Sequence, residues 1–176
     1  MTTVVLFGIT GGYIADEIKR VLEHYGIIAI SGSNIYEVEP EPKFLLVECS
    51  TRAKIDAGSG IIVMIGEIAD SCRLAIPKEY KGVVYSSDKG ALKILMNNNI
   101  QTIVCGMSEE STLILSSIGE NTASVCLQRR IITLGGNTVE PAEYPVKLKN
   151  KITDYALLAA FAILLLSDIE PRDIEY

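Results

Sequence analysis

A glycine-containing turn near the N-terminus, residues 8–11 (GITG), opens like a loop that binds phosphate groups. A loop of the type G-x-x-x-x-G-K-[ST] needs a lysine for the β- and γ-phosphates and a hydroxyl for magnesium where the following helix starts. Our alignment places Ala15 and Asp16 at these two positions. Because the helix dipole favours a carboxylate at this end, we expect Asp16 to fill the site that a phosphate would use.

Other side chains that could do chemistry are few. His24 is the one histidine, so histidine metal sites and Ser-His or Cys-His catalysis are hard to build. The four cysteines are far apart in sequence with no C-x-x-C pair, and three lie in apolar strings typical of buried, reduced thiols. A nucleophilic Cys49 or Cys105 is kept as an alternative. We expect no catalytic residue and no metal site.

Composition narrows the classes of protein. The chain has 176 residues, 48% of them hydrophobic and 22% charged, which is typical of one globular domain spanning residues 1–176. The net charge of −6 argues against nucleic acid or an anionic membrane as a partner. The longest apolar run, residues 155–166, is shorter than the ~20 residues that a bilayer requires, and no signal peptide is evident. We therefore predict a cytoplasmic protein.

Short apolar runs alternate with helical stretches, a pattern that predicts an α/β fold with a doubly wound, mostly parallel sheet of the P-loop or Rossmann type. Strands are expected at residues 4–9, 27–30, 44–47, 61–65, 82–85 and 100–105, and helices at 13–25, 88–98 and 154–166. The acidic, proline-containing stretch 37–42 is expected to be a loop. Residues 111–149 hold several β-type runs between glycine turns, which predicts a small antiparallel subsheet.

Within the first expected helix, apolar residues recur at helical spacing and charged residues fall between them. This pattern puts Asp16, Glu17 and Lys19 on the polar, solvent-facing side. The last expected helix is apolar throughout and should be buried.

Several strings, in this order, resemble the central ATP-binding domain of the Mur ligases, which join an amino acid to a peptidoglycan precursor by way of an acyl-phosphate. The resembling strings are VLFGITG at 5–11, FLLVECS at 44–50, VVYSSDKGALKIL at 83–95, IQTIVCGMSEES at 100–111 and the segment 149–174. The β-rich stretch 111–149 falls where the family has its small antiparallel sheet. The resemblance covers nearly the whole chain, and the ligases' flanking domains are expected to be absent.

The resemblance implies roles for particular residues. It places Thr10 and Gly11 in the phosphate loop, makes Glu48 the magnesium glutamate, and makes Asp88 an acid that contacts the nucleotide. The segment 58–80 has no D-H pair for a second metal and no match for the family's modified lysine. The family's histidine and asparagines at the last helix fall on Asn150, Lys151 and Asp154.

These departures predict a degenerate, stand-alone pseudoenzyme that is not a ligase. We expect a binding or regulatory module for an unknown small molecule or protein, with Thr10, Gly11, Gly12, Glu48 and Asp88 as the ligand site. ATP and magnesium are disfavoured as cofactors, since the strand ends are rich in hydroxyls and acids and suit a neutral or cationic ligand better. Nucleotide binding without turnover, an enzyme of another class, and a homo-oligomer stay open as alternatives.

Overall fold

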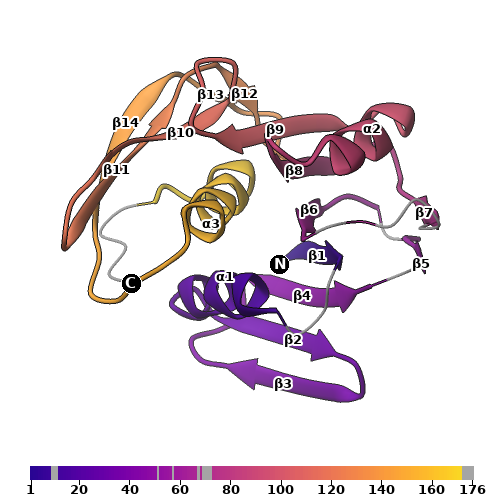
Figure 1. The fold of residues 1–176 in the computed structure, drawn as a ribbon. Helices are drawn as coiled ribbons and strands as arrows, with labels where there is room; N and C mark the ends of the chain where they lie inside the picture. The colour runs from indigo at the N-terminus through magenta and orange to yellow at the C-terminus, as the bar shows by residue number, and fades with distance from the viewer. Residues whose placement is uncertain (9–11, 51, 57, 67, 69–72, 172–176) are drawn as a thin grey trace.

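One ten-stranded sheet runs through the molecule, and three helices pack on its faces (Figure 1). The structure, a computed structural model, describes residues 1–8, 12–50, 52–56, 58–66, 68 and 73–171. The helices are α1 (Tyr13–Glu23), α2 (Lys89–Asn97) and α3 (Asp154–Leu166). The parallel strands are β1 (Thr2–Gly8), β2 (Ile27–Ser31), β4 (Phe44–Cys49), β6 (Ile61–Ile65), β8 (Lys81–Tyr85) and β9 (Gln101–Gly106).

The remaining strands are mostly antiparallel or lie apart from the main sheet. They are β3 (Asn34–Val38), β5 (Arg52–Lys54), β7 (Arg73–Ala75), β10 (Leu113–Ile118), β11 (Thr122–Leu127), β12 (Ile131–Ile132), β13 (Thr138–Val139) and β14 (Ala142–Lys147). The order in the main sheet is β14-β11-β10-β9-β8-β6-β1-β4-β2-β3, while β12–β13 and β5–β7 form two small sheets. The predicted α/β fold with a mostly parallel sheet is confirmed.

The antiparallel strands near the C-terminus continue the main sheet. β10 pairs in parallel with β9 at Leu113–Cys105 and Ile114–Gly106, and then antiparallel with β11, which pairs with β14. The subsheet expected in residues 111–149 is therefore present as an extension of the parallel sheet.

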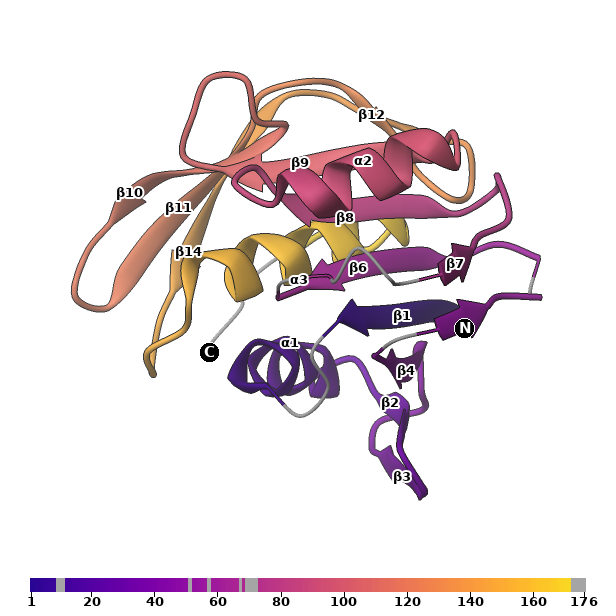
Figure 2. The same ribbon diagram turned by 45° about the vertical axis from the view of Figure 1, so that its right-hand side comes forward.

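The helices form two layers on opposite faces of the sheet (Figure 2). On one face, α1 and α3 contribute to a large apolar core, in which every residue from Tyr155 to Leu166 is buried. A helix that is apolar on all sides is buried on all sides, so the prediction for residues 154–166 is confirmed. On the other face, α2 packs with β6 and β8 in a second, smaller core. No helix in the described part of the chain is long and apolar enough to cross a membrane.

The acidic stretch after β2 differs from the prediction. Glu37 and Val38 were expected in a loop but belong to β3, which pairs antiparallel with β2 through Ile28–Glu37 and Ile27–Val38. Hairpin pairing on an existing strand outweighs the weak β-propensity of glutamate. The loop begins at Glu39 and returns the chain to β4, which lies between β2 and β1.

Gly8 ends β1 in a conformation that only glycine adopts easily. Its φ is +141°, and a Cβ built on it would lie 1.7 Å from the main-chain oxygen of Ile65 in β6. The close approach of β6 therefore requires glycine at the point where the chain leaves β1 for the loop before α1.

Candidate functional site

All three helices begin beside the carboxyl ends of the parallel strands, around one cleft. The cleft has a volume of about 680 Å³. It is lined by Tyr13, Ile14, Met64, Gly66, Tyr85, Ser87, Asp88, Lys89, Thr153, Asp154 and Tyr155. Open α/β sheets bind their ligands at this edge, so the cleft is the candidate site.

The cleft combines aromatic side chains with acids. Tyr85 and Tyr155 lie with their ring centroids 5.2 Å apart and their planes inclined by 49°. The hydroxyl of Tyr155 donates to the main-chain oxygen of Met64 at 2.6 Å, and burial raises the pKa of this phenol. Lys89 is the cation of the lining, and its Nζ donates to the carbonyl of Ser86 at 3.0 Å.

Asp88 lies in the cleft and caps α2. Its Oδ1 accepts a hydrogen bond from the backbone N–H of Ala91 at 2.9 Å, as an N-cap aspartate commonly does. A role for Asp88 toward a ligand stays a prediction.

The start of α3 is capped from another helix. The carboxylate of Glu17 in α1 accepts from the Thr153 backbone N–H at 3.1 Å and from its hydroxyl at 2.5 Å. Glu17 was expected on the solvent-facing side of α1. It instead satisfies donors at the N-terminus of the buried helix α3, where the dipole favours a negative charge.

The phosphate-like loop itself is only partly described. Thr10 and Gly11, two of the predicted ligand residues, lie outside the described residues. Gly12 is the N-cap residue of α1, with φ −80° and ψ 150°, and as a glycine it has no side chain that could cap the helix. Counted strictly from Gly8, the pattern puts its lysine and hydroxyl at Ile14 and Ala15, one residue before our alignment. Neither register supplies a lysine, serine or threonine, because residues 12–16 are GYIAD.

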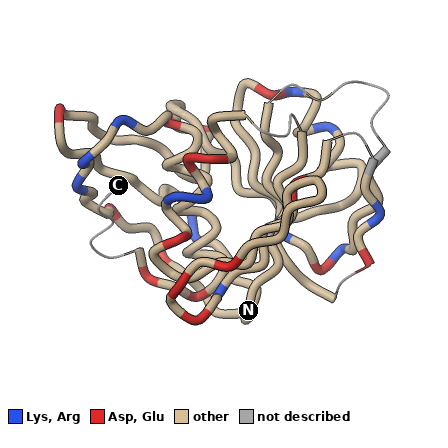
Figure 3. Tube along the Cα trace, turned by 90° about the horizontal axis from the view of Figure 1, so that it is seen from below, with Lys and Arg blue, Asp and Glu red and all other residues tan. Residues whose placement is uncertain are grey.

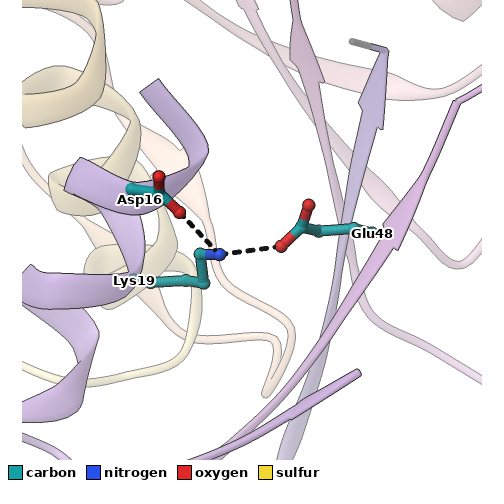
Figure 4. Close-up of polar contacts among 3 residues, drawn as sticks. All are labelled: Asp16, Lys19 and Glu48. Atoms are coloured by element: carbon teal, nitrogen blue, oxygen red, sulfur yellow. Dashed lines mark hydrogen bonds and ion pairs between the residues drawn. The ribbon is translucent and has the colours of Figure 1, made fainter. Parts of the chain in front are cut away.

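An ion pair links α1 to β4 (Figure 4). The ammonium of Lys19 lies 2.8 Å from Oε1 of Glu48 and 2.8 Å from Oδ1 of Asp16. The side chain of Glu48 is 2% exposed and that of Lys19 is 11% exposed, whereas that of Asp16 is 51% exposed. Lys19 and Glu48 therefore form a nearly buried pair, with Asp16 as a half-exposed third member.

The pKa of Lys19 reflects two opposing influences. Burial is the largest influence and lowers this pKa, but hydrogen bonds to Asp16 and Glu48, together with the negative charge of Glu48, outweigh it. The net pKa lies above the ordinary value of 10.5, so the ammonium stays charged at every physiological pH.

Two sequence expectations are corrected here. Asp16 was expected to fill the phosphate site at the helix start, but its carboxylate is bound to Lys19 along the side of α1. Lys19 was expected on the polar face, but its side chain extends from α1 toward β4 and reaches Glu48. The spacing Ala15–Lys19–Leu22 follows the buried face of α1, and this signal could have found it.

Glu48 does not suit magnesium in this arrangement. The carboxylate that the resemblance assigns to the metal already holds a buried ammonium at hydrogen-bond distance. A divalent ion would have to displace Lys19 from Glu48 and leave the half-exposed Asp16 as the partner of this nearly buried ammonium, which is costly. The described residues contain no group of three or more histidine, cysteine or acidic side chains that could hold a metal ion. Glu48 is also not among the residues that line the cleft, so the structure separates it from Asp88.

The cysteines that could act as nucleophiles are poorly placed for it. Cys105 is fully buried in the larger core, and burial raises the pKa of its thiol well above the ordinary range. Cys49 is half-buried, and burial also raises the pKa of its thiol. A reactive cysteine needs the opposite shift. Cys72 lies outside the described residues.

The charges of the chain are mixed along its length. Figure 3 shows lysines and arginines scattered among aspartates and glutamates in the view from below. Among the residues that the structure describes, no continuous run of lysines and arginines stands out in this view.

Comparisons with known proteins place the fold. No protein-family model matches the sequence, and no curated protein matches it significantly. Solved structures do match. The UDP-N-acetylmuramoylalanyl-D-glutamyl-2,6-diaminopimelate–D-alanyl-D-alanyl ligase from Acinetobacter baumannii has a TM-score of 0.61 and 14% identity, over 99% of this chain and 44% of that chain.

Two further structures agree. The MurF ligase from Thermotoga maritima in complex with ADP has a TM-score of 0.55 and 14% identity, over 98% of this chain and 47% of that chain. The UDP-N-acetylmuramate:L-alanyl-gamma-D-glutamyl-meso-diaminopimelate ligase from Neisseria meningitides has a TM-score of 0.59 and 10% identity, over 97% of this chain and 63% of that chain. This chain thus spans less than two thirds of each of these ligases. It has the fold of a Mur ligase central domain.

Proposed function

We propose that this chain is a binding module with the Mur ligase central-domain fold that does not perform ligation. Its ligand, a small molecule or a segment of another protein, occupies the cleft at the strand ends. The observation that carries this proposal is the ion pair between Lys19 and Glu48, 2.8 Å long, at the position where the family resemblance puts a magnesium ligand.

In this proposal, the ammonium of Lys19 takes the place of a metal ion at the carboxylate of Glu48. Phosphoryl transfer depends almost wholly on positioning and on cations that neutralise the phosphate oxygens. Here an internal ammonium neutralises Glu48, while residues 12–16 provide no lysine and no aliphatic hydroxyl for a phosphate or a metal. The cleft instead offers tyrosines and two aspartates, Asp88 and Asp154, which favour neutral or cationic groups.

The direct test is an assay of ATP hydrolysis and acyl-phosphate formation by the purified chain with magnesium. We expect rates at the level of the blank, unchanged in Glu48→Gln and Glu48→Ala. Turnover above the blank that disappears in both variants would show that Glu48 holds a catalytic metal, and the proposal would be wrong.

Nucleotide binding without turnover is the second candidate. It is favoured by the size of the cleft and by the N-terminus of α1, whose dipole suits a phosphate. The Thermotoga maritima ligase of similar fold was solved in complex with ADP. Titration with ADP and ATP, with and without magnesium, separates the two candidates. Saturable micromolar binding that weakens in Asp88→Asn would favour this second function.

A further inference from the structure

One face of the sheet carries a strip of apolar side chains outside both cores. The strip consists of Ile28 and Ile30 in β2, Ile35 in β3, and Leu45 and Val47 in β4. Strand register makes them neighbours, because Ile30 pairs with both Ile35 and Val47 and Ile28 pairs with Leu45. Side chains alternate along a strand, so all five point to the face opposite α1.

The two faces of the same strands are covered very differently. On the α1 side, Ile27, Ala29, Phe44 and Leu46 are buried in the large core. On the other side, no strip residue belongs to either core or packs against one among the described residues. Ile35 is 72% exposed, and the other four are half-buried. Figure 2 shows α2 lying over β8 and β9, with no helix drawn over the outer side of β2 and β3.

The connection between β2 and β4 explains the gap. These parallel neighbours would ordinarily be joined by a helix that crosses one face of the sheet. Here residues 32–43 return as the hairpin strand β3 and a short loop. The strands therefore keep an apolar outer face of the kind that a doubly wound sheet covers with a helix, and this chain's own connection does not provide one.

The exposed charges along β3 and the loop after it are acidic. Residues 31–42 contain no lysine and no arginine, but they contain Glu37, Glu39 and Glu41, and Lys43 follows directly before β4. Glu37 lies on the same face as the strip, since it pairs with Ile28, and it is exposed together with Glu39 and Glu41. A second copy of this chain would bring the same three glutamates against these, which disfavours self-association through this face.

We propose that the strip is the docking surface for an amphipathic helix of a partner protein, with an apolar stripe facing the sheet and lysine or arginine along its rim. A helix packs its apolar stripe on a half-covered sheet as a crossover helix would. The basic rim pairs with the glutamates of β3 and the following loop. This surface lies on the sheet face, not at the cleft, so the inference is independent of the ligand proposed there.

The test uses the full chain and a labelled synthetic helix of about 18 residues, long enough to lie along the sheet at ~1.5 Å per residue. The probe has leucines at helical spacing and lysines elsewhere. Its controls are the same peptide with glutamate in place of lysine, and a scrambled leucine–lysine peptide without helical spacing. We expect micromolar binding of the first peptide only, with isoleucine methyl NMR signals shifting for Ile28, Ile30 and Ile35 and not for Ile132.

Matched variants locate the site. Ile35→Asp should weaken binding by about tenfold or more, because the apolar contact that Ile35 makes with the bound peptide is lost. Ile132→Asp, at a 46% exposed strand position elsewhere, should leave it unchanged. Glu37→Lys should weaken binding more than Glu120→Lys, a charge reversal in the exposed turn between β10 and β11.

Three results would overturn the proposal. The first is no binding, or equal binding of the three peptides. The second is an equal loss in Ile35→Asp and Ile132→Asp. The third is a dimer by light scattering that Ile35→Asp converts to a monomer, which would make a second copy the occupant of this face.

Discussion

Replacing Lys19 by methionine should destabilise the protein far more than removal of an ordinary surface lysine. Methionine keeps most of the aliphatic stem in place, so the change removes mainly the charge and its hydrogen bonds. Glu48, whose side chain is 2% exposed, then keeps its charge without the ammonium at 2.8 Å. Breaking a buried pair in this way costs about 3–5 kcal/mol.

The magnitude is moderated by the surroundings. Lys19 retains 11% exposure, so water reaches the site, and we take the lower part of that range. The contact with Asp16 adds less than ~1 kcal/mol, because that carboxylate is 51% exposed and screened by solvent. We expect a loss of roughly 3 kcal/mol in the free energy of unfolding, which corresponds to about 6–12 °C in Tm for a chain of this size.

The assay is urea unfolding followed by circular dichroism, with Lys54→Met as the matched control. Lys54 pairs with Asp56 at 3.4 Å, but the two side chains are 79% and 89% exposed, so this control should behave like wild type. The double variant Lys19→Met/Glu48→Met should recover most of the loss, since neither charge of the buried pair then remains. If Lys19→Met is no more destabilising than Lys54→Met, the reasoning about this pair is refuted.

The difference in unfolding free energy between wild type and Lys19→Met should depend on pH with a definite sign. The folded pKa of Lys19 lies above its ordinary value of 10.5, so the ammonium's contribution is fully present below pH 10.5 and is lost as the pH rises through the folded value. The difference between wild type and Lys19→Met should therefore stay constant from neutral pH to about pH 9.5. A difference that shrinks within this window would contradict the assignment.

Further predictions concern the elements around the cleft and are checked by the same unfolding assay. Tyr155→Phe removes the hydrogen bond to a buried main-chain oxygen of β6 and should cost about 1–2 kcal/mol. Glu17→Leu leaves the start of α3 uncapped and should cost about 1–2 kcal/mol, with protection of α3 amides from hydrogen exchange reduced. Gly8→Ala should prevent stable folding, because the added methyl would lie 1.7 Å from a main-chain oxygen of β6. Hydrogen bonds from two serine hydroxyls lower the pKa of Glu143, so any stability difference between wild type and Glu143→Gln should be present above pH 4.5 and disappear as the pH falls below it.

Much of the fold could be predicted because its signals are local. Apolar runs gave the parallel strands to within two residues, as for β6, whose bounds matched at Ile61–Ile65. The uniformly apolar stretch 155–166 has the length of a helix and no polar face, which indicated a buried helix. The strand β3 was missed because its pairing with β2 is a tertiary effect that the acidic, proline-containing sequence conceals.

The site was less accessible to prediction for a physical reason. The partners of the ion pair are separated by 29 residues, so the helical spacing that places Lys19 on the buried face of α1 does not identify Glu48 as its partner. Glu17 meets Thr153 across 136 residues and was equally invisible in the sequence. Glu48 and Asp88 were identified from the order of resembling strings. In the structure, Glu48 contacts Lys19, whereas Asp88 lines the cleft.

A crystal structure of the chain soaked with magnesium and a non-hydrolysable ATP analogue tests the central claim most directly. We expect Nζ of Lys19 to stay at hydrogen-bond distance from Oε1 of Glu48, with no metal on that carboxylate. Magnesium bound to Glu48, with Lys19 displaced and the analogue's terminal phosphates held at the start of α1, would contradict it.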